Sequence, residues 1–234
     1  MPLRLWAARL RHRVRSLIGR DLVLPREIDV DIELLGSEYG GFAIVRGSLN
    51  QDSVVLSCGI GEDASFDLAV IEKYGCRVQA YAPTPQSVDW VRSNIHDDRF
   101  VFHECAVGAM DGPLRLYLPR NPNHVSASIK AGQHTSAEFI DVPCKRLATI
   151  LADLKVAKVD VLKMDIEGAE YGVVADFFGT ASRILPAQIA IEFHHYQRAF
   201  GVSATRAALE LLHQADYRIA WRSVSHREVL LVKS

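Results

Sequence analysis

Three polar residues that close two apolar runs of the sequence could do chemistry together. Asp165 ends the run "VLKMD", and Glu192 and His194 lie in "QIAIEFHH". Residues i and i+2 of a strand share one face, so Glu192 and His194 are expected to point together while His195 points away. The carboxyl ends of parallel strands meet at one edge of a sheet, so Asp165 is expected to join Glu192 and His194 there.

Such a group can activate a hydroxyl in two ways. His194 can accept the proton directly as a general base. Alternatively, Asp165, Glu192 and His194 can ligate a divalent cation such as Mg²⁺ that polarises the hydroxyl. A purely structural role is also open, because Asp165 can cap the following helix and Glu167 favours its dipole. The sequence predicts Asp165, His194 and Glu192 as catalytic residues and the same three as metal ligands.

A glycine turn, "SCGIGED", follows an earlier apolar run. Gly59 and Gly61 would let the backbone approach a ligand without interference from a Cβ atom. No Gly-Lys-Ser/Thr follows, and the dinucleotide pattern G-x-G-x-x-G fails, which disfavours a phosphate-binding loop. Glu62 and Asp63 would repel a pyrophosphate. They suit a ligand with cationic groups, such as S-adenosylmethionine, which carries a sulfonium and an ammonium.

The elements that must position these residues alternate between apolar strands and helices. Strands are expected at "SVVLSC", "CRVQAYA", "RFVFHECAVG", "VDVLKMD" and "QIAIEFHH", with helices between most of them. This order predicts an α/β fold with a mostly parallel, doubly wound sheet. The last two runs, "YRIAWRSV" and "REVLLVK", are close enough to form an antiparallel hairpin at the sheet edge. Gly75 is expected to stop one helix, and Thr84 with Pro85 to begin the next.

Two segments fall outside this alternation. Residues 1–35 are interpreted as a basic amphipathic helix with its connector, and residues 36–234 as one domain with an insertion at about 111–140. In the helix, apolar residues recur at helical spacing from Leu3 to Ile18 between arginines. That helix could pack on the body or on a second subunit, or lie on an anionic membrane surface. The insertion holds His124 and Ser126 in a polar loop suited to an acceptor.

Charge and composition exclude several classes of protein. The 234 residues are 49% hydrophobic and 24% charged, as in ordinary globular domains. Residues 1–20 hold six arginines and no acid, so removing them from the net charge of -1 leaves -7 for the remainder. A negative body argues against a nucleic-acid partner. No apolar run is long enough for a membrane span, and the four cysteines are scattered, so a cytoplasmic location, with possible peripheral membrane contact through residues 1–20, is expected.

Four stretches together resemble the FkbM-type family of S-adenosylmethionine-dependent methyltransferases. They are "GSEYGG", "VVLSCGIGEDASFDLAVIEKYGCRVQAYAPTP", "VDVLKMDIEGAEYGVV" and "QIAIEFHHY", and they span about residues 36–233. The most specific part is "LKMDIEGAE" followed by "EFHH". The resemblance implies a Rossmann-like methyltransferase sheet whose last strand is antiparallel. It also implies O-methylation of a sugar or natural-product-like hydroxyl, with S-adenosyl-L-methionine as cofactor.

The resemblance also implies which residues contact the cofactor. They are Gly59, Ile60, Gly61, Glu62, Asp63, Ala82, Ala106, Glu38 and Tyr39, the last two as a lid over the methionine end. The family usually has an acid where this chain has Ala82, so the contact expected to hold the ribose hydroxyls is missing. A hydrogen bond to a charged group contributes about 1.5–3 kcal/mol, so its loss weakens binding roughly 10- to 150-fold.

The sequence therefore predicts a methyltransferase acting on a small hydroxylated molecule. The alternative is a catalytically impaired interaction protein that keeps the fold and docks a membrane or partner through its Arg-rich helix. A nicotinamide oxidoreductase is a poor third choice because the glycine fingerprint fails.

Overall fold

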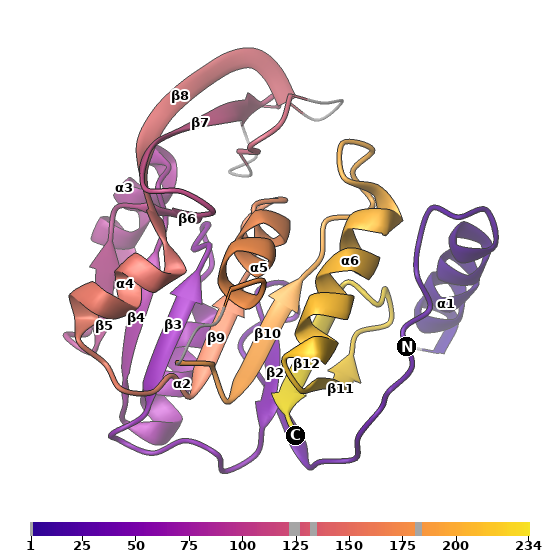
Figure 1. Cartoon of the computed structure of the whole chain (residues 1–234), viewed down its shortest axis with the longest axis horizontal. Helices are drawn as coiled ribbons and strands as arrows, with labels where there is room; N and C mark the ends of the chain where they lie inside the picture. The colour runs from indigo at the N-terminus through magenta and orange to yellow at the C-terminus, as the bar shows by residue number, and fades with distance from the viewer. Residues whose placement is uncertain (1, 122–126, 132–134, 181–183) are drawn as a thin grey trace.

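A seven-stranded sheet forms the centre of the protein (Figure 1). The computed structural model describes residues 2–121, 127–131, 135–180 and 184–234. The sheet has the strand order β11-β12-β10-β9-β3-β4-β5. Its strands are β3 (Val54–Cys58), β4 (Arg77–Tyr81), β5 (Phe100–His103), β9 (Val161–Met164), β10 (Gln188–Glu192), β11 (Tyr217–Arg222) and β12 (Glu228–Lys233).

The direction of the strands confirms the predicted topology. The pairs β3–β4, β4–β5, β3–β9 and β9–β10 are parallel, whereas β12 is antiparallel to both β10 and β11. The chain runs outward from β3 to β5 and then returns to the other side of β3 at β9. Ligands of open α/β sheets bind at such a switch point, beyond the carboxyl ends of the strands.

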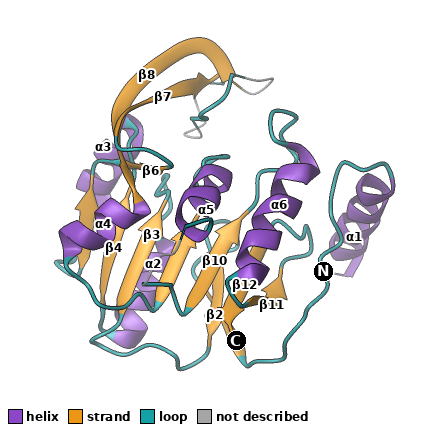
Figure 2. Ribbon diagram, in the orientation of Figure 1, coloured by secondary structure: helices purple, strands orange, loops and turns teal. Residues whose placement is uncertain are grey.

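Helices cover both faces of the sheet (Figure 2). Apolar side chains of three helices join one core cluster with β9 and β10, and those of two others join a second cluster on the opposite face with β3 and β4. The first three are α4 (Leu147–Leu154), α5 (Glu170–Phe178) and α6 (Gly201–Gln214), and the other two are α2 (Ser65–Tyr74) and α3 (Pro85–Asn94). The predicted ends of α2 and α3 are confirmed. Gly75 closes α2 at φ +74°, and the side chain of Thr84 caps α3 by accepting from the backbone N–H of Ser87.

Two smaller sheets rise beside the central one. The short strands β1 (Ile32–Leu35) and β2 (Phe42–Val45) pair around a bend that contains Gly36, Gly40 and Gly41. In the insertion, β7 (Gly112–Pro119) and β8 (Thr135–Arg146) form a long antiparallel pair, joined by β6 (Ala106–Gly108). This pair arches over the carboxyl end of the central sheet (Figure 1). It extends beyond the predicted limits of 111–140 because β8 continues to Arg146 and leads directly into α4.

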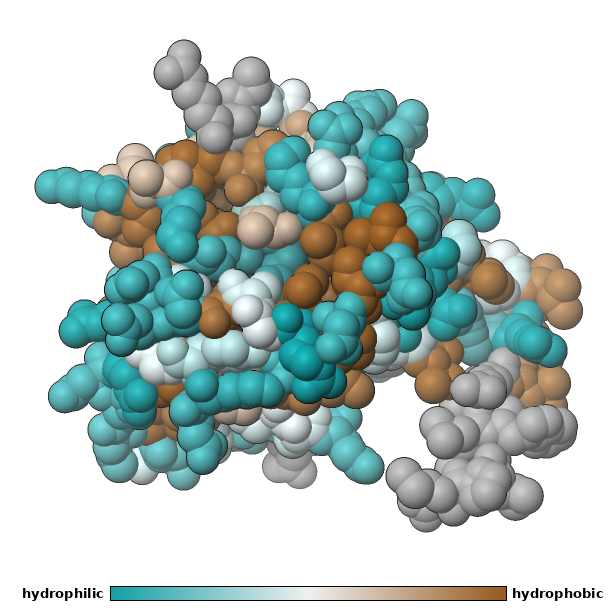
Figure 3. Space-filling view, turned by 90° about the horizontal axis from the view of Figure 1, so that it is seen from below, coloured by the Kyte–Doolittle hydropathy of each residue, from teal (hydrophilic) through white to brown (hydrophobic). Residues whose placement is uncertain are grey.

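The N-terminal helix α1 (Pro2–Leu17) lies at the side of the molecule beyond α6 (Figure 1). Its described apolar residues face outward rather than into the body: Leu10, Val14, Leu17 and Ile18 are 46–86% exposed. Figure 3 shows hydrophobic surface at this projecting end. These four residues therefore do not pack on the body, whereas Arg15 of the same helix pairs with Asp21. Contact of the helix with a second subunit or a membrane stays a prediction. Among the side chains of α1 that the structure describes, the buried one is polar and lies on the opposite face: the ring of His12 is 4.2 Å from that of His226.

The connector after α1 is held firmly by the body. Leu22 and Leu24 are buried in the core cluster of α4, α5 and α6. The backbone N–H of Leu24 donates to Nδ1 of His226 at 2.8 Å. Within the described part of the chain, no helix combines the length and the apolar character needed to cross a membrane.

Candidate active site

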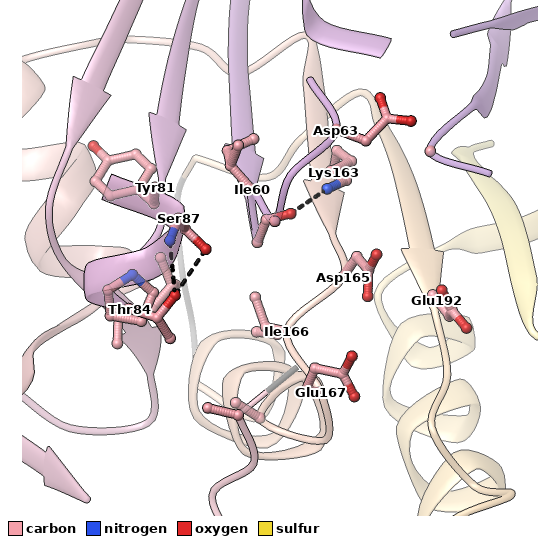
Figure 4. Close-up of a pocket in the computed structure, with 18 of the residues that line it drawn as sticks. Ile60, Asp63, Tyr81, Thr84, Ser87, Lys163, Asp165, Ile166, Glu167 and Glu192 are labelled. Atoms are coloured by element: carbon pink, nitrogen blue, oxygen red, sulfur yellow. Dashed lines mark hydrogen bonds between the residues drawn. The ribbon is translucent and has the colours of Figure 1, made fainter. Parts of the chain in front are cut away.

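A cavity of about 730 Å³ opens at the carboxyl ends of β3, β4, β9 and β10, on the side where β7 arches over the sheet. Glycines and acids of the β3 turn line one part of it, and the carboxylates that follow β9 and β10 line another (Figure 4). Its size is that of sites that bind a small molecule or a cofactor. Of the residues predicted to be catalytic or to contact the cofactor, all except Ala82 line this cavity.

The β3 turn packs tightly on the end of β9 because of Gly59. This residue has φ +92°, and a Cβ atom here would lie 1.7 Å from the carbonyl oxygen of Asp165. The backbone N–H of Asp165 donates to the carbonyl of Cys58 at 2.9 Å, and Nζ of Lys163 donates to the carbonyl of Gly59 at 2.7 Å. Only glycine fits this conformation and this distance. The glycine therefore brings the turn and the Asp165 backbone into direct contact.

The two acids of the turn are held by neighbouring polar groups. Oδ1 of Asp63 accepts the backbone N–H of Ser65, and Oδ2 accepts the hydroxyl of Ser37, both at 2.7 Å. Burial would raise the pKa of Asp63, but the hydrogen bonds from Ser65 and Ser37 outweigh it and lower the pKa. Oε1 of Glu62 accepts from Nε2 of Gln86 at 3.0 Å. This part of the cavity is therefore anionic at neutral pH, which suits a cationic ligand.

Ser37 also organises the loop that carries Glu38 and Tyr39. Its Oγ accepts the backbone N–H groups of Tyr39 and Gly40 at 3.1 and 2.8 Å while donating to Asp63. Tyr39 lines the cavity yet is 87% exposed. The loop therefore borders the mouth of the cavity, and its predicted role as a lid stays a prediction.

Ala82 differs from its predicted place. The residue is 1% exposed, packs in the apolar cluster of β3 and β4, and does not line the cavity, whereas Tyr81 and Pro83 do. The hydroxyls of Thr84 and Ser87, 2.7 Å apart, line this side of the cavity instead (Figure 4).

The predicted face of β10 is oriented as expected. Glu192 and His194 both line the cavity. Figure 4 shows Asp165 across from Glu192, at the end of the neighbouring strand β9. Burial, and next the charge of Asp165, raise the pKa of Glu192 to about 8. The carboxyl of Glu192 is therefore largely protonated at neutral pH.

His194 is 1% exposed and is surrounded by carboxylates. Its Nδ1 lies 3.1 Å from Oε1 of Glu170, and its Nε2 lies 3.6 Å from Asp165 and 3.5 Å from Glu167. Burial alone would lower the pKa of His194, but the hydrogen bond to Glu170 and the nearby charges outweigh it and raise the pKa to about 10. An imidazolium cannot accept a proton, which argues against His194 as a direct base without a cation beside it.

His195 points away from the cavity, as the strand alternation predicts. Its Nε2 lies 2.7 Å from Oδ1 of Asp21, and its Nδ1 lies 3.2 Å from the hydroxyl of Thr205 on α6. Asp21 and His195 are both buried. The connector after α1 is thus attached to the residue next to His194.

Several residues that line the cavity were not predicted from the sequence. The sequence favours Glu167 as a partner of the helix dipole, but its carboxylate reaches His194 because a left-handed φ of +52° turns the chain before α5. Lys163 lies in the middle of β9, and Asp67 lies on the buried face of α2 with Oδ1 lacking a hydrogen-bond partner among the described residues. The sequence does carry a signal for Lys163 and Asp67. Each is a charged residue inside an apolar run, which is uncommon unless the charge has a partner.

The remaining residues singled out in the sequence are Ala106, two residues of the insertion loop and the cysteines. Ala106, at the start of β6, lines the cavity together with Leu114 and Leu116 of β7. His124 and Ser126, the predicted acceptor contacts, lie outside the described residues. The four cysteines are buried and free.

Comparison with known proteins identifies the same region of the chain. The profile described as the methyltransferase FkbM domain matches residues 55–219. The human "probable methyltransferase-like protein 24" is 22% identical over 202 residues, which cover 82% of this chain and 49% of that protein. The chain therefore spans about half the length of this curated relative.

Solved structures give weaker likenesses. The methyltransferase FkbM from Methylobacillus flagellatus aligns with a TM-score of 0.48 at 15% identity, over 79% of this chain and 44% of the other. The fibrillarin pre-rRNA processing protein of Methanococcus jannaschii aligns with a TM-score of 0.49 at 14% identity, over 91% and 86% of the two chains. The strand order and the profile match, rather than these alignments, define the fold and the family.

Proposed function

The chain belongs to the FkbM methyltransferase family, and we propose that it transfers a methyl group from S-adenosyl-L-methionine to a hydroxyl oxygen of a small molecule. The acceptor class that we infer is a sugar or a natural-product-like alcohol. The negative charge of the body outside residues 1–20 favours such an acceptor over a nucleic acid.

One observation carries the proposal. A single cavity at the switch point of the sheet holds both the acidic glycine turn of β3 and the carboxylate and histidine group that follows β9 and β10. A transferase of this kind needs a cofactor subsite and a group that activates the acceptor, next to each other. The distance between the two parts is short because Gly59 contacts the backbone of Asp165.

The residues of the turn fit the cofactor. When bound, S-adenosyl-L-methionine supplies a methyl group that is already activated by the sulfonium. Glu62 and Asp63 offer negative charge to a cationic ligand, and Gly59 and Gly61 leave the backbone accessible. In place of an acid at position 82, the hydroxyls of Thr84 and Ser87 are available for ribose.

The acceptor hydroxyl must lose its proton near Asp165. The roles predicted for Asp165, Glu192 and His194 are those of proton acceptors or of ligands to a divalent cation. The geometry favours a cation held by Asp165 and His194, with Glu167 in the place predicted for Glu192. One oxygen of Asp165, one of Glu167 and a ring nitrogen of His194 lie within 4.8 Å of one another. Glu170 holds the other ring nitrogen of His194, as carboxylates do behind metal-bound histidines. A cation here would polarise the hydroxyl and take the place of the proton on Nε2.

Titration calorimetry with S-adenosylhomocysteine tests the cofactor assignment. We expect binding in the tens to hundreds of micromolar range, weakened by the missing acid at position 82. Asp63→Asn should weaken binding further, whereas Asp52→Asn, in an exposed turn remote from the cavity, should leave it unchanged.

The absence of heat at millimolar ligand would contradict the proposal. It would favour the alternative of a methyltransferase-like interaction protein. In that case deletion of residues 1–20 should abolish localisation, while Asp165→Ala and His194→Ala should leave the cellular phenotype intact.

A further inference from the structure

A second cavity, of about 630 Å³, lies between the end of α1, residues 130 and 131, the first residue of β8 and the start of α6. Four cationic side chains line it: Arg15, Arg20, Lys130 and Arg198. No Asp or Glu occurs among the described residues that line it. It is therefore a positively lined opening on a body whose charge is otherwise negative.

Two of these cations are available to a ligand. Arg20 and Arg198 are exposed, and neither forms an ion pair with any residue that the structure describes. Arg15 is partly neutralised by Asp21, with Nε 3.3 Å from Oδ2. The Nζ of Lys130 donates to the carbonyl of Ala199 at 3.2 Å and retains further protons for a ligand.

The start of α6 adds backbone donors to the same cavity. Gly201 and Val202 line it, and the first turn of this 14-residue helix carries no acidic residue and no side-chain cap. The backbone N–H of Gly201 donates to the carbonyl of Gln197 at 3.2 Å. The N–H groups of the following residues in the first turn have no partner within the helix, and the dipole there favours an anion. Backbone donors and arginines thus meet at one place.

The cavity is adjacent to the proposed active site. Tyr196 lines both cavities, and His195 in this one follows His194 in the other. A molecule with its hydroxyl near His194 can therefore extend past Tyr196 into the second cavity.

We propose that the second cavity binds a phosphoryl group carried by the methyl acceptor. Arginine presents paired donors that match phosphate oxygens, and a phosphate offers enough oxygens for two arginines, a lysine and helix N–H groups at once. Identification of the bound molecule as the acceptor rests on the proposed methyltransferase function. The binding of phosphate itself does not.

The phosphate can belong to a soluble molecule or to a lipid. Leu17 and Ile18, 86% and 59% exposed, lie beside Gly19 and Arg20 of the cavity wall. A lipid phosphate could therefore enter the cavity while its chains contact these apolar residues. Pyrophosphate and lipid vesicles separate the two sources.

The test titrates pyrophosphate into the full chain by calorimetry. We expect the double variant Arg20→Gln/Arg198→Gln to bind pyrophosphate about 100-fold or more weakly than the wild type, because each charge-assisted contact contributes roughly tenfold or more. The control Arg13→Gln/Arg206→Gln removes the same charge from α1 and α6 at exposed positions outside the cavity. It should bind within about twofold of the wild type.

Flotation with phosphatidylcholine vesicles, with and without phosphatidic acid, is measured on the same three proteins. Pyrophosphate binding lost in the double variant supports a soluble source of the phosphate. Binding to vesicles that contain phosphatidic acid, without binding to pyrophosphate, supports a lipid source if the double variant loses it.

No binding of either probe, or an equal loss in the control variant, overturns the proposal. S-adenosylhomocysteine binding, measured in parallel, should be equal in all three proteins. If S-adenosylhomocysteine does not bind, the proposed methyltransferase function is contradicted. The phosphate measurements still test the second cavity independently.

Discussion

Nδ1 of His194 lies 3.1 Å from Oε1 of Glu170, and the Glu170 side chain is fully buried. The same carboxylate accepts the backbone N–H of His194 at 3.0 Å and that of Gly168 at 2.8 Å. Glu170 therefore connects the end of β10 to the start of α5. It fixes the imidazole so that Nε2 faces Asp165 and Glu167.

This pair predicts a stability that falls as the pH rises. The pKa of His194 is raised from 6.5 to about 10, so its stabilising contribution is complete below about pH 6.5 and is lost as the pH rises through about 10. The pKa of Glu192 is raised from 4.5 to about 8, which gives a loss of the same sign as the pH rises through about 8. Thermal unfolding followed by circular dichroism between about pH 6 and 10 should show Tm decreasing throughout.

Two variants test whether the pair of Glu170 and His194 causes this pH dependence. Glu170→Gln breaks a buried ion pair, so it should lower the free energy of unfolding by about 3–5 kcal/mol at neutral pH and flatten the decrease above pH 8. His213→Gln is the control, because His213 pairs with Glu27 at a partly exposed site. Its profile should match the wild type. An unchanged profile in Glu170→Gln would show that another group titrates.

The group of Asp165, Glu167 and His194 predicts cation binding with release of a proton. We expect Mn²⁺ to raise Tm and to displace the proton from Nε2 of His194. Calorimetry in two buffers of different ionisation enthalpy measures that proton. Asp165→Asn/Glu167→Gln should weaken Mn²⁺ binding at least about tenfold, whereas Asp97→Asn/Glu104→Gln, at surface ion pairs, should not. Equal Mn²⁺ binding by both double variants would rule out a cation at this place.

The contact between Gly59 and Asp165 predicts a large effect of a single methyl group. Gly59→Ala combines backbone strain of about 1–3 kcal/mol with overpacking of about 1–3 kcal/mol, because the new Cβ would meet the Asp165 carbonyl. Gly112→Ala has a similar positive φ of +113° but nothing within 4 Å, so it should show the strain alone. Denaturant unfolding measures both. Equal losses of unfolding free energy in the two variants would mean that the β3 turn moves away from the end of β9 at no energetic cost.

A carboxylate at position 82 is expected to increase the affinity for S-adenosylhomocysteine. Ala82→Asp restores a carboxylate beside Tyr81 and Pro83, which line the cavity, and should tighten S-adenosylhomocysteine binding at least about tenfold. Ala82→Asn, with the same shape and no charge, should gain less. Unchanged affinity in a folded Ala82→Asp protein would mean that Thr84 and Ser87 suffice for the ribose. A lowered Tm in that variant would reflect the cost of an acid in the apolar cluster around residue 82.

The sequence by itself determined the parts that depend on local patterns. Apolar runs alternating with helices predicted the parallel sheet, the short "SHR" connection predicted the edge hairpin, and Thr84 and Gly75 predicted helix ends. The period of two along a strand placed Glu192 and His194 on one face and His195 on the other, because side chains of a strand alternate strictly.

The tertiary structure decided which of these groups touch and what charge they carry. Glu170 is unremarkable in sequence, yet its burial against His194 sets the protonation of that histidine. Ala82 follows its strand as predicted but lies in the core, and Arg20 and Arg198, 178 positions apart in the sequence, border one cavity. These properties depend on packing between segments distant in the chain, and local sequence patterns carry no record of such contacts.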